Sequence, residues 1–290
     1  MKQFNFTYIL SFLCLISLGL SIFTISQARN GNSSTSQISP TFSSNLLQQI
    51  KDKGQLDACV AVLPPAVIKS ANGDFSGHDI EIVNSLAKRM QVKANFVEST
   101  FGSIVPSIQS GKCQIATTFF AQIPRAMSVA FSKPLFYSGL SALSRQGETR
   151  FNSLQDLDKE GITIATSLGE GGDNFAKEYF KKAKINSIPG DTSDVNRFMI
   201  EVTSGRADVA IADAQQINLF SKANPQTLDL FVKNPFQISP VNIAMPNTDP
   251  GFVQFINTAL DFMETTGEID IIFKKYDATW IREVKTYQIR

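Results

Sequence analysis

From about residue 46 onward, short apolar runs alternate with amphipathic stretches, and this alternation most limits the folds open to the chain. Apolar runs bounded by glycine or polar residues predict buried strands, whereas apolar residues spaced three and four positions apart predict helices. Strands that alternate with helices form mostly parallel sheets covered on both faces. The alternation occurs in two series, so we expect an α/β protein with two lobes.

The expected elements follow from the same pattern. In the first series we expect strands at 56–63, 92–97 and 114–119, and helices at 79–90 and 103–110, the latter with Ser103 as its N-cap. In the second series we expect strands at 162–166 and 208–212, and helices at 174–183, 193–204 and 215–222. The extended apolar segments 135–144 and 235–245 are expected to cross between lobes, and the helices 250–265 and 268–276 to return to the first lobe.

The first 28 residues have the pattern of an export signal. Lys2 supplies positive charge, residues 8–25 are largely apolar, and Ser26-Gln27-Ala28 provides a small-x-small cleavage site. We favour a cleavable signal peptide at 1–28 over an uncleaved membrane anchor. No lipid-attachment motif is evident, because Leu13 before Cys14 is bulky, and export without an anchor favours a periplasmic location. Residues 29–45 are expected to form a flexible leader.

Charge and metal-ligating residues exclude several classes of function. The chain has 27 Lys and Arg against 26 Asp and Glu, without a basic cluster, which argues against binding to nucleic acid or to an anionic membrane. One histidine, His78, and two cysteines outside the signal leave little material for a zinc site, so we expect neither metal nor cofactor. We expect His78 at the surface or in a hinge. Cys59 and Cys113 could form a disulfide, but burial as separate thiols is favoured.

Arg125 and Asp213 are the main candidates for ligand binding. Each follows an apolar run that reads as a buried strand, and ligands of open α/β sheets bind at the carboxyl ends of strands. A guanidinium matches a carboxylate through two parallel hydrogen bonds, and a carboxylate accepts from an ammonium group. Either residue alone is best explained by a structural salt bridge. Together they suit a zwitterion such as a free α-amino acid.

Seven segments over residues 46–281, in family order, resemble the extracytoplasmic solute-binding proteins of amino-acid ABC importers, which have the periplasmic-binding-protein type II fold. The segments are Pro64-Pro65, NGDFSGHDIEIVNSLAKRM, FGSIVPSIQSGK, Arg125 with the run from Phe131 to Pro134, GITIATSLGEGG, GRADVAIAD and TGEIDIIFKKY. The resemblance implies two lobes, each with a mostly parallel sheet flanked by helices, joined by two crossover strands. It implies lobe 1 at 46–138 and 241–290 and lobe 2 at 139–240.

The resemblance also implies roles for individual residues. Arg125 would hold the ligand's α-carboxylate and Asp213 its α-ammonium group, while Phe101 would stack on the ligand side chain. The glycine-rich turn that contains Ser167 and Gly171 precedes a helix and would add contacts to the carboxylate.

This sequence departs from the family at the wall of the first lobe. Thr118 and Phe120 lie where the family commonly has Gly-x-Thr, so we expect them at the ligand, with Phe120 filling space that a threonine would occupy. Residues 60–65 lack the usual polar and aromatic side chains before the proline pair. We therefore expect a more apolar side-chain compartment, or a ligand that is not a standard amino acid.

The expected function is capture of an amino acid or related carboxylate by a monomeric periplasmic protein that delivers it to the membrane permease subunits of an ABC importer. Two alternatives remain: a cyclohexadienyl or arogenate dehydratase of the same fold, and a ligand sensor without a transporter. The dehydratase is disfavoured because Pro240, which cannot donate a proton, occupies the position of the general acid.

Overall fold

The computed structural model describes residues 45–278; the expected signal peptide and almost all of the leader lie outside the described residues. The described part of the chain contains a mixed sheet of ten strands, together with a separate two-stranded hairpin. No described helix has the length and apolar character needed to cross a membrane.

The strands of the large sheet fall into two parallel sets and an antiparallel ribbon. Its main path runs β4-β1-β5-β12-β7-β10-β8-β9, with β6 and β11 paired at its side. The first set is β1 (Gln55–Val60), β4 (Lys93–Glu98) and β5 (Ile115–Phe120); the second is β8 (Thr163–Ser167), β9 (Lys184–Ile188) and β10 (Val209–Asp213). The ribbon is β7 (Phe136–Arg145) and β12 (Phe236–Met245), the side strands are β6 (Ala130–Phe131) and β11 (Thr227–Asp229), and the hairpin is β2 (Ile68–Lys69) and β3 (Phe75–Ser76).

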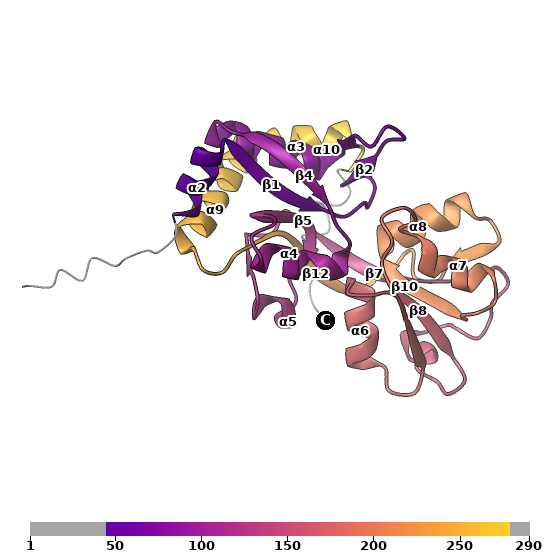
Figure 1. Cartoon of the computed structure of the whole chain (residues 1–290). Helices are drawn as coiled ribbons and strands as arrows, with labels where there is room; N and C mark the ends of the chain where they lie inside the picture. The colour runs from indigo at the N-terminus through magenta and orange to yellow at the C-terminus, as the bar shows by residue number, and fades with distance from the viewer. Residues whose placement is uncertain (1–44, 279–290) are drawn as a thin grey trace, which may run out of the picture. The chain divides into compact units, whose positions relative to one another are not determined.

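The helices pack beside the parallel sets (Figure 1). Those of the first series and of the C-terminal segment are α2 (Leu46–Lys53), α3 (His78–Met90), α4 (Phe101–Gln109), α5 (Ile123–Ala126), α9 (Pro250–Thr265) and α10 (Glu268–Lys275). Those of the second series are the 3-10 helix η1 (Leu154–Leu157) and the α-helices α6 (Gly171–Tyr179), α7 (Arg197–Thr203) and α8 (Ala214–Ala223).

Separate hydrophobic cores support the two parallel sets. The largest core joins β1 and α3 to the C-terminal helices through residues such as Leu86, Phe252 and Phe273. The N-terminus of α2 also contacts α9, because the Leu46 amide donates to the Asp249 carboxylate over 2.7 Å. A second core forms around Phe175 in the second set. The C-terminal helices therefore return to the first core, whereas the lobe boundaries proposed above remain predictions.

The antiparallel ribbon brings the carboxyl ends of the two parallel sets together. Phe120, the last residue of β5, is in register with Val241, which is in register with Phe136 on β7. Asp213, the last residue of β10, is in register with Leu140 on β7. The two positions are four residues apart along β7, a span of about 13 Å at the usual rise of a strand. Because β5 and β10 run in opposite directions, their ends point toward each other.

Three expected helix boundaries were wrong. Thr100, not Ser103, is the N-cap of α4, and Ser103 supplies the N3 side chain of its capping box. The expected helix 174–183 ends at Tyr179, because Phe180 takes an extended conformation and packs into the second core, and β9 then follows. Helix α7 begins only at Arg197. Charged residues after Tyr179 fit a helix and an edge strand equally well, so the pattern missed β9.

His78 does begin a helix, but the expectation that it lies at the surface was wrong, and a hinge role stays a prediction. The imidazole is fully buried at the start of α3, where its ring stacks on Phe273 and meets Phe136 edge to face. Its Nδ1 is 2.7 Å from the Asp79 carboxylate. Aromatic neighbours from distant parts of the chain bury the ring, and local sequence gives no sign of them.

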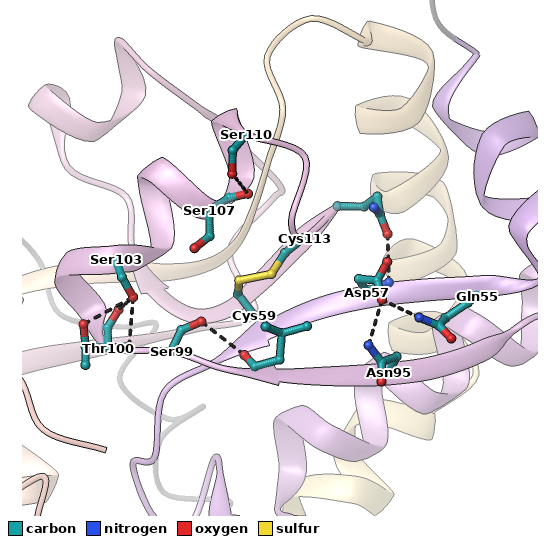
Figure 2. Close-up of a disulfide and its surroundings, with 12 residues drawn as sticks. Gln55, Asp57, Cys59, Asn95, Ser99, Thr100, Ser103, Ser107, Ser110 and Cys113 are labelled. Carbon is teal, nitrogen blue, oxygen red and sulfur yellow. Dashed lines mark hydrogen bonds between the residues drawn. A yellow bond between two sulfur atoms is a disulfide. The ribbon is translucent and has the colours of Figure 1, made fainter. Parts of the chain in front are cut away.

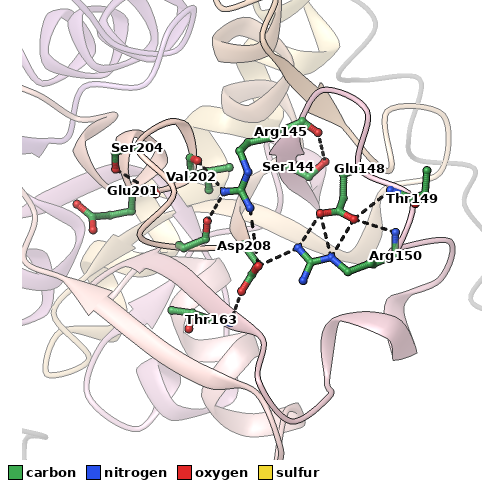
Figure 3. Close-up of polar contacts among 11 residues, drawn as sticks. Ser144, Arg145, Glu148, Thr149, Arg150, Thr163, Glu201, Val202, Ser204 and Asp208 are labelled. Carbon is green, nitrogen blue, oxygen red and sulfur yellow. Dashed lines mark hydrogen bonds and ion pairs between the residues drawn. The ribbon is translucent and has the colours of Figure 1, made fainter.

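A network of hydrogen bonds and ion pairs connects the end of β7 to residues of the second series (Figure 3). Arg145 donates to the carbonyls of Val202 and Ala207 over 2.9 and 2.8 Å. Arg150 donates to Glu148 and to Asp208, over 2.7 and 2.8 Å. Hydrogen bonds from Arg150 hold the pKa of the Glu148 carboxyl well below its usual range, to about 2. These two arginines are thus occupied by structural partners.

Cys59 and Cys113 form a disulfide, so the preference for separate buried thiols was wrong. Cys59 lies on β1 and Cys113 just before β5, with their Cα atoms 5.6 Å apart (Figure 2). Both cysteines are fully buried. Pairing of β1 with β5 brings together two residues that are 54 positions apart in the sequence. Each cysteine by itself resembles an ordinary small apolar residue of a core, so no local pattern distinguishes the two states.

We predict that loss of this disulfide lowers the free energy of unfolding by about 4 kcal/mol, because the bond closes a long loop in the unfolded chain. The Cys59→Ala/Cys113→Ala protein should unfold at lower urea concentration than the wild type. Dithiothreitol should lower the melting temperature of the wild type and leave that of the double variant unchanged. Equal sensitivity of both proteins to the reductant would contradict a stabilising role.

Candidate functional site

One cavity is lined by residues from both parallel sets, at the place where β5 and β10 end. Its empty space is about 500 Å³ when the part open to solvent is counted. Three ionisable side chains line it: Arg125, Glu170 and Asp213. The remaining lining residues are mostly apolar or aromatic, namely Leu63, Ala66, Phe101, Thr118, Phe120, Phe136, Gly171, Gln215, Gln216 and Val241.

Arg125 lies on the short helix α5, one turn beyond the end of β5, and is only 7% exposed. Its Nη1 donates to the Phe120 carbonyl over 3.0 Å and its Nη2 to the Gly169 carbonyl over 2.5 Å. Its guanidinium carbon lies 3.8 Å from the centre of the Phe119 ring. Burial lowers the pKa of Arg125 to about 10, and the nearby Glu170 opposes that change. The guanidinium has five N–H groups, so N–H groups remain for a ligand.

Asp213 is the last residue of β10 and the N-cap of α8, where its Oδ1 accepts from the Gln215 amide over 2.9 Å. Its Oδ2 accepts from the Ser138 hydroxyl over 2.5 Å. The residue is 9% exposed, and burial raises the pKa of its carboxyl against the opposing effect of these hydrogen bonds. None of the ion pairs formed among residues 45–278 involves Asp213. The carboxylate of Asp213 therefore accepts hydrogen bonds from uncharged groups. It keeps further lone pairs that could accept from a cation.

Thr118 lies at the cavity wall in a strained backbone conformation. Its φ of 52° is unusual for a β-branched residue. The hydroxyl donates to Oδ2 of Asp79, whose other oxygen contacts His78. This buried chain fixes the direction of the Thr118 side chain. Backbone strain of this kind persists where the surrounding structure holds it and is common at binding sites.

The aromatic residues and the glycine-rich turn take different positions around the cavity. Phe101, Phe120 and Gly171 line it, whereas Ser167 lines a neighbouring cavity on the other side of Glu170. Phe120 packs against Gly171 so closely that a Cβ added there would lie 2.6 Å from the ring. Gly171 is thus required for packing of the Phe120 ring. Of the seven residues expected at the ligand, Ser167 alone lies outside the cavity that contains Arg125 and Asp213.

Glu170 is an acidic group of this cavity that sequence reasoning missed. It is the N-cap of α6 but makes no side-chain cap hydrogen bond, and it is 7% exposed. Burial raises the pKa of its carboxyl to about 8; a hydrogen bond from Ser167 and the charge of Arg125 oppose the rise, while Asp213 and Asp173 add to it. In the sequence, Glu170 reads as one residue of a surface turn. Its place in the turn shortly after the end of β8 was the available signal.

The pKa of Glu170 predicts a pH-dependent stability. The folded protein keeps the Glu170 proton up to about pH 8, whereas the unfolded chain loses it near the ordinary value of 4.5. Stability from this group is therefore complete below about pH 4.5 and is lost as pH rises toward 8. We expect Glu170→Gln to be increasingly stable relative to the wild type between pH 5 and 8 in urea melts. Glu178→Gln, on the exposed face of α6, is the control and should parallel the wild type.

The sequence pattern of bacterial extracellular solute-binding proteins, family 3, matches residues 58–279. A probable histidine-binding protein of Campylobacter jejuni is 26% identical over 70% of this chain and 77% of its own length. Cyclohexadienyl dehydratase of Pseudomonas aeruginosa is 23% identical over 76% of this chain and 82% of its own length.

A crystal structure of the ancestral amino acid-binding protein AncCDT-1, a precursor of cyclohexadienyl dehydratase, superimposes with a TM-score of 0.71 and 28% identity. It covers 80% of this chain and 99% of its own. The expected type II periplasmic-binding-protein fold is therefore confirmed. Since the match to the family spans most of the sequence, this protein belongs to the bacterial extracellular solute-binding proteins of family 3.

Proposed function

We propose that the protein captures a free amino acid outside the cytoplasm and delivers it to an ABC importer. One observation carries this proposal: Arg125 and Asp213, of opposite charge and almost fully buried, line one cavity, and neither forms an ion pair within the described part of the chain. Burying a charge without a partner is costly. A zwitterionic ligand would supply a partner to each.

The roles of the two groups follow from their remaining hydrogen-bonding capacity. The ligand carboxylate binds the N–H groups of Arg125 that the Phe120 and Gly169 carbonyls leave unused. The ligand ammonium group binds Asp213, which still has free lone pairs beside its contacts with Ser138 and the Gln215 amide.

Surrounding residues would orient the ligand and exclude water. Phe101 and Phe120 contribute ring surfaces for the ligand side chain. The Thr118 hydroxyl, which donates to Asp79, offers its oxygen as a hydrogen-bond acceptor. Gly171 brings the start of α6 to the cavity wall. Ser167 acts from the neighbouring cavity through its hydrogen bond to Glu170. Exclusion of water would strengthen both ligand charge pairs.

Capture involves movement of one lobe against the other, and β7 and β12 are the segments that connect them. Three side-chain hydrogen bonds join the two series: Arg125 to the Gly169 carbonyl, Gln215 to the Pro64 carbonyl over 2.8 Å, and Asn174 to Gln122 over 2.7 Å. Closure around a ligand would place both lobes in the relation that the permease subunits recognise. Export to the periplasm and a monomeric state complete this proposal.

A second candidate function is supported by Glu170. Elimination of a hydroxyl group by a dehydratase requires a general acid beside the leaving oxygen. Pro240 cannot serve and does not line the cavity, but Glu170 is a buried carboxyl that keeps its proton near neutral pH. Incubation with prephenate and with arogenate tests this function by the appearance of an aromatic product. Turnover that is lost in Glu170→Gln would make binding the secondary role, and absence of turnover would remove this candidate.

We predict that Arg125→Ala weakens amino-acid binding by about 2–5 kcal/mol, the usual cost of truncating one partner of a buried charge pair. A thermal-shift screen of free amino acids selects the ligand, and calorimetry measures its affinity for both proteins. Arg206→Ala, which removes an exposed arginine paired with Glu201, is the control. Normal binding by Arg125→Ala would refute the proposed role.

Asp213→Asn should weaken binding of L-lysine far more than binding of 6-aminohexanoate, which lacks the α-ammonium group. Asparagine is as good an N-cap as aspartate, so α8 should keep its start and the fold should be preserved. Calorimetry with both ligands, together with melting curves, separates the two effects. Equal losses for the two ligands would show that Asp213 does not contact the ammonium group.

A further inference from the structure

We propose that Glu170 selects amino acids whose side chain carries a second positive charge, by placing its carboxylate where the ligand side chain leaves the Arg125 and Asp213 cavity. This inference rests on the proposed function and names the class of substrate. It concerns a residue that the sequence analysis did not place at the ligand.

The first argument is position. The cavity that contains Arg125 and Asp213 has a neighbour, here called the outer cavity, which is lined in part by Ser167, Asp191, Asp194 and Arg197. Glu170 and Phe101 are the two residues that line both cavities. A ligand held at both its α-groups and extending toward the outer cavity would therefore meet a carboxyl group and an aromatic ring. An ammonium or guanidinium group interacts favourably with both.

The second argument is the charge balance of the inner cavity. Arg125 is its one cation and Glu170 and Asp213 are its two acids, counted among the lining residues that the structure describes. A ligand with no net charge satisfies Arg125 and Asp213, and Glu170 then stays protonated beside Ser167. An additional positive charge on the ligand side chain would pair with the Glu170 carboxylate once its proton is released. The outer cavity adds Asp191 and Asp194 against Arg197, so its charge also favours a cation.

The third argument is that the Glu170 carboxyl does not cap its own helix. It is placed at the N-cap of α6, where glutamate side chains can bond the first helix amides, yet it makes no such bond. Its side-chain partner is the hydroxyl of Ser167, which lines the outer cavity. The acid is therefore available to a ligand.

The charged groups around Glu170 predict a proton exchange on binding. Arg125, Asp213 and Asp173 act on its carboxyl, and burial keeps it protonated near neutral pH. A ligand cation beside it would favour the ionised form, so binding should release a proton from Glu170. Asp213 faces the α-ammonium group, which every amino acid has. A difference between two amino acids that share this group therefore reports on Glu170 rather than Asp213.

The experiment compares L-arginine with L-citrulline, which has nearly the same shape and a neutral side chain. Calorimetry at pH 7 in phosphate and in Tris gives the affinity and the number of protons released. We expect the wild type to bind arginine at least tenfold more tightly than citrulline and to release more protons with arginine. In Glu170→Gln the preference should fall to less than threefold and the additional release should vanish. Glu178→Gln, on the exposed face of the same helix, should behave as the wild type.

The outcomes separate this inference from the proposed function. Equal affinity of the wild type for arginine and citrulline, or a preference that survives in Glu170→Gln, overturns the role of Glu170 while amino-acid capture stands. Absence of binding by any amino acid overturns both. The proton count is measured on the wild type, so the inference stays testable even if Glu170→Gln does not fold.

Discussion

Pairing of β7 with β12 is the constraint on which the site depends. Each parallel set can form its own sheet and core, but alone each would present its strand ends to solvent. The ribbon hydrogen-bonds β5 on one side and β10 on the other, so both sets become parts of one sheet. Because β5 and β10 approach from opposite directions, Arg125 and Asp213 reach a common cavity. Two residues almost ninety positions apart are thus brought together by register in a sheet.

The cavity concentrates charge where burial makes charge expensive. Arg125, Glu170 and Asp213 are each at least nine-tenths buried, and burial is the main cause of the pKa shift of each. Backbone carbonyls, hydroxyls and amides supply partial compensation, unlike at Arg150, where carboxylates supply full ion pairs. A protein built only for stability would replace such groups with apolar ones of similar volume. Their presence at one place is what the proposed binding role requires.

Glu170 places an acidic group within the largely apolar wall of the cavity. Phe101, Phe120, Phe136 and Val241 give the cavity a largely apolar wall. An apolar wall around an acid lowers the local dielectric, which raises the cost of an uncompensated charge and sharpens selection of a ligand that compensates it. The same environment would suit proton donation to a leaving group. Ligand binding and turnover experiments distinguish these two uses of one carboxyl group.

The sequence by itself determined the elements that depend on local pattern. The helix expected at 250–265 has those bounds in the structure, and the segments expected to cross between lobes became β7 and β12. Arg125 and Asp213 were recognisable because a charged residue closely following an apolar strand is unusual. Such features are encoded within a few residues, where side-chain periodicity and caps act.

Tertiary structure decided what depends on neighbours from distant parts of the chain. The disulfide of Cys59 and Cys113 required strand pairing, and the burial of His78 required Phe136 and Phe273. The role of Glu170 depends on the cavities on either side of it, which no local pattern describes. Burial and charge environment are properties of the assembled surfaces, so a carboxyl group that looks like part of a solvated turn has a raised pKa only once the fold buries it.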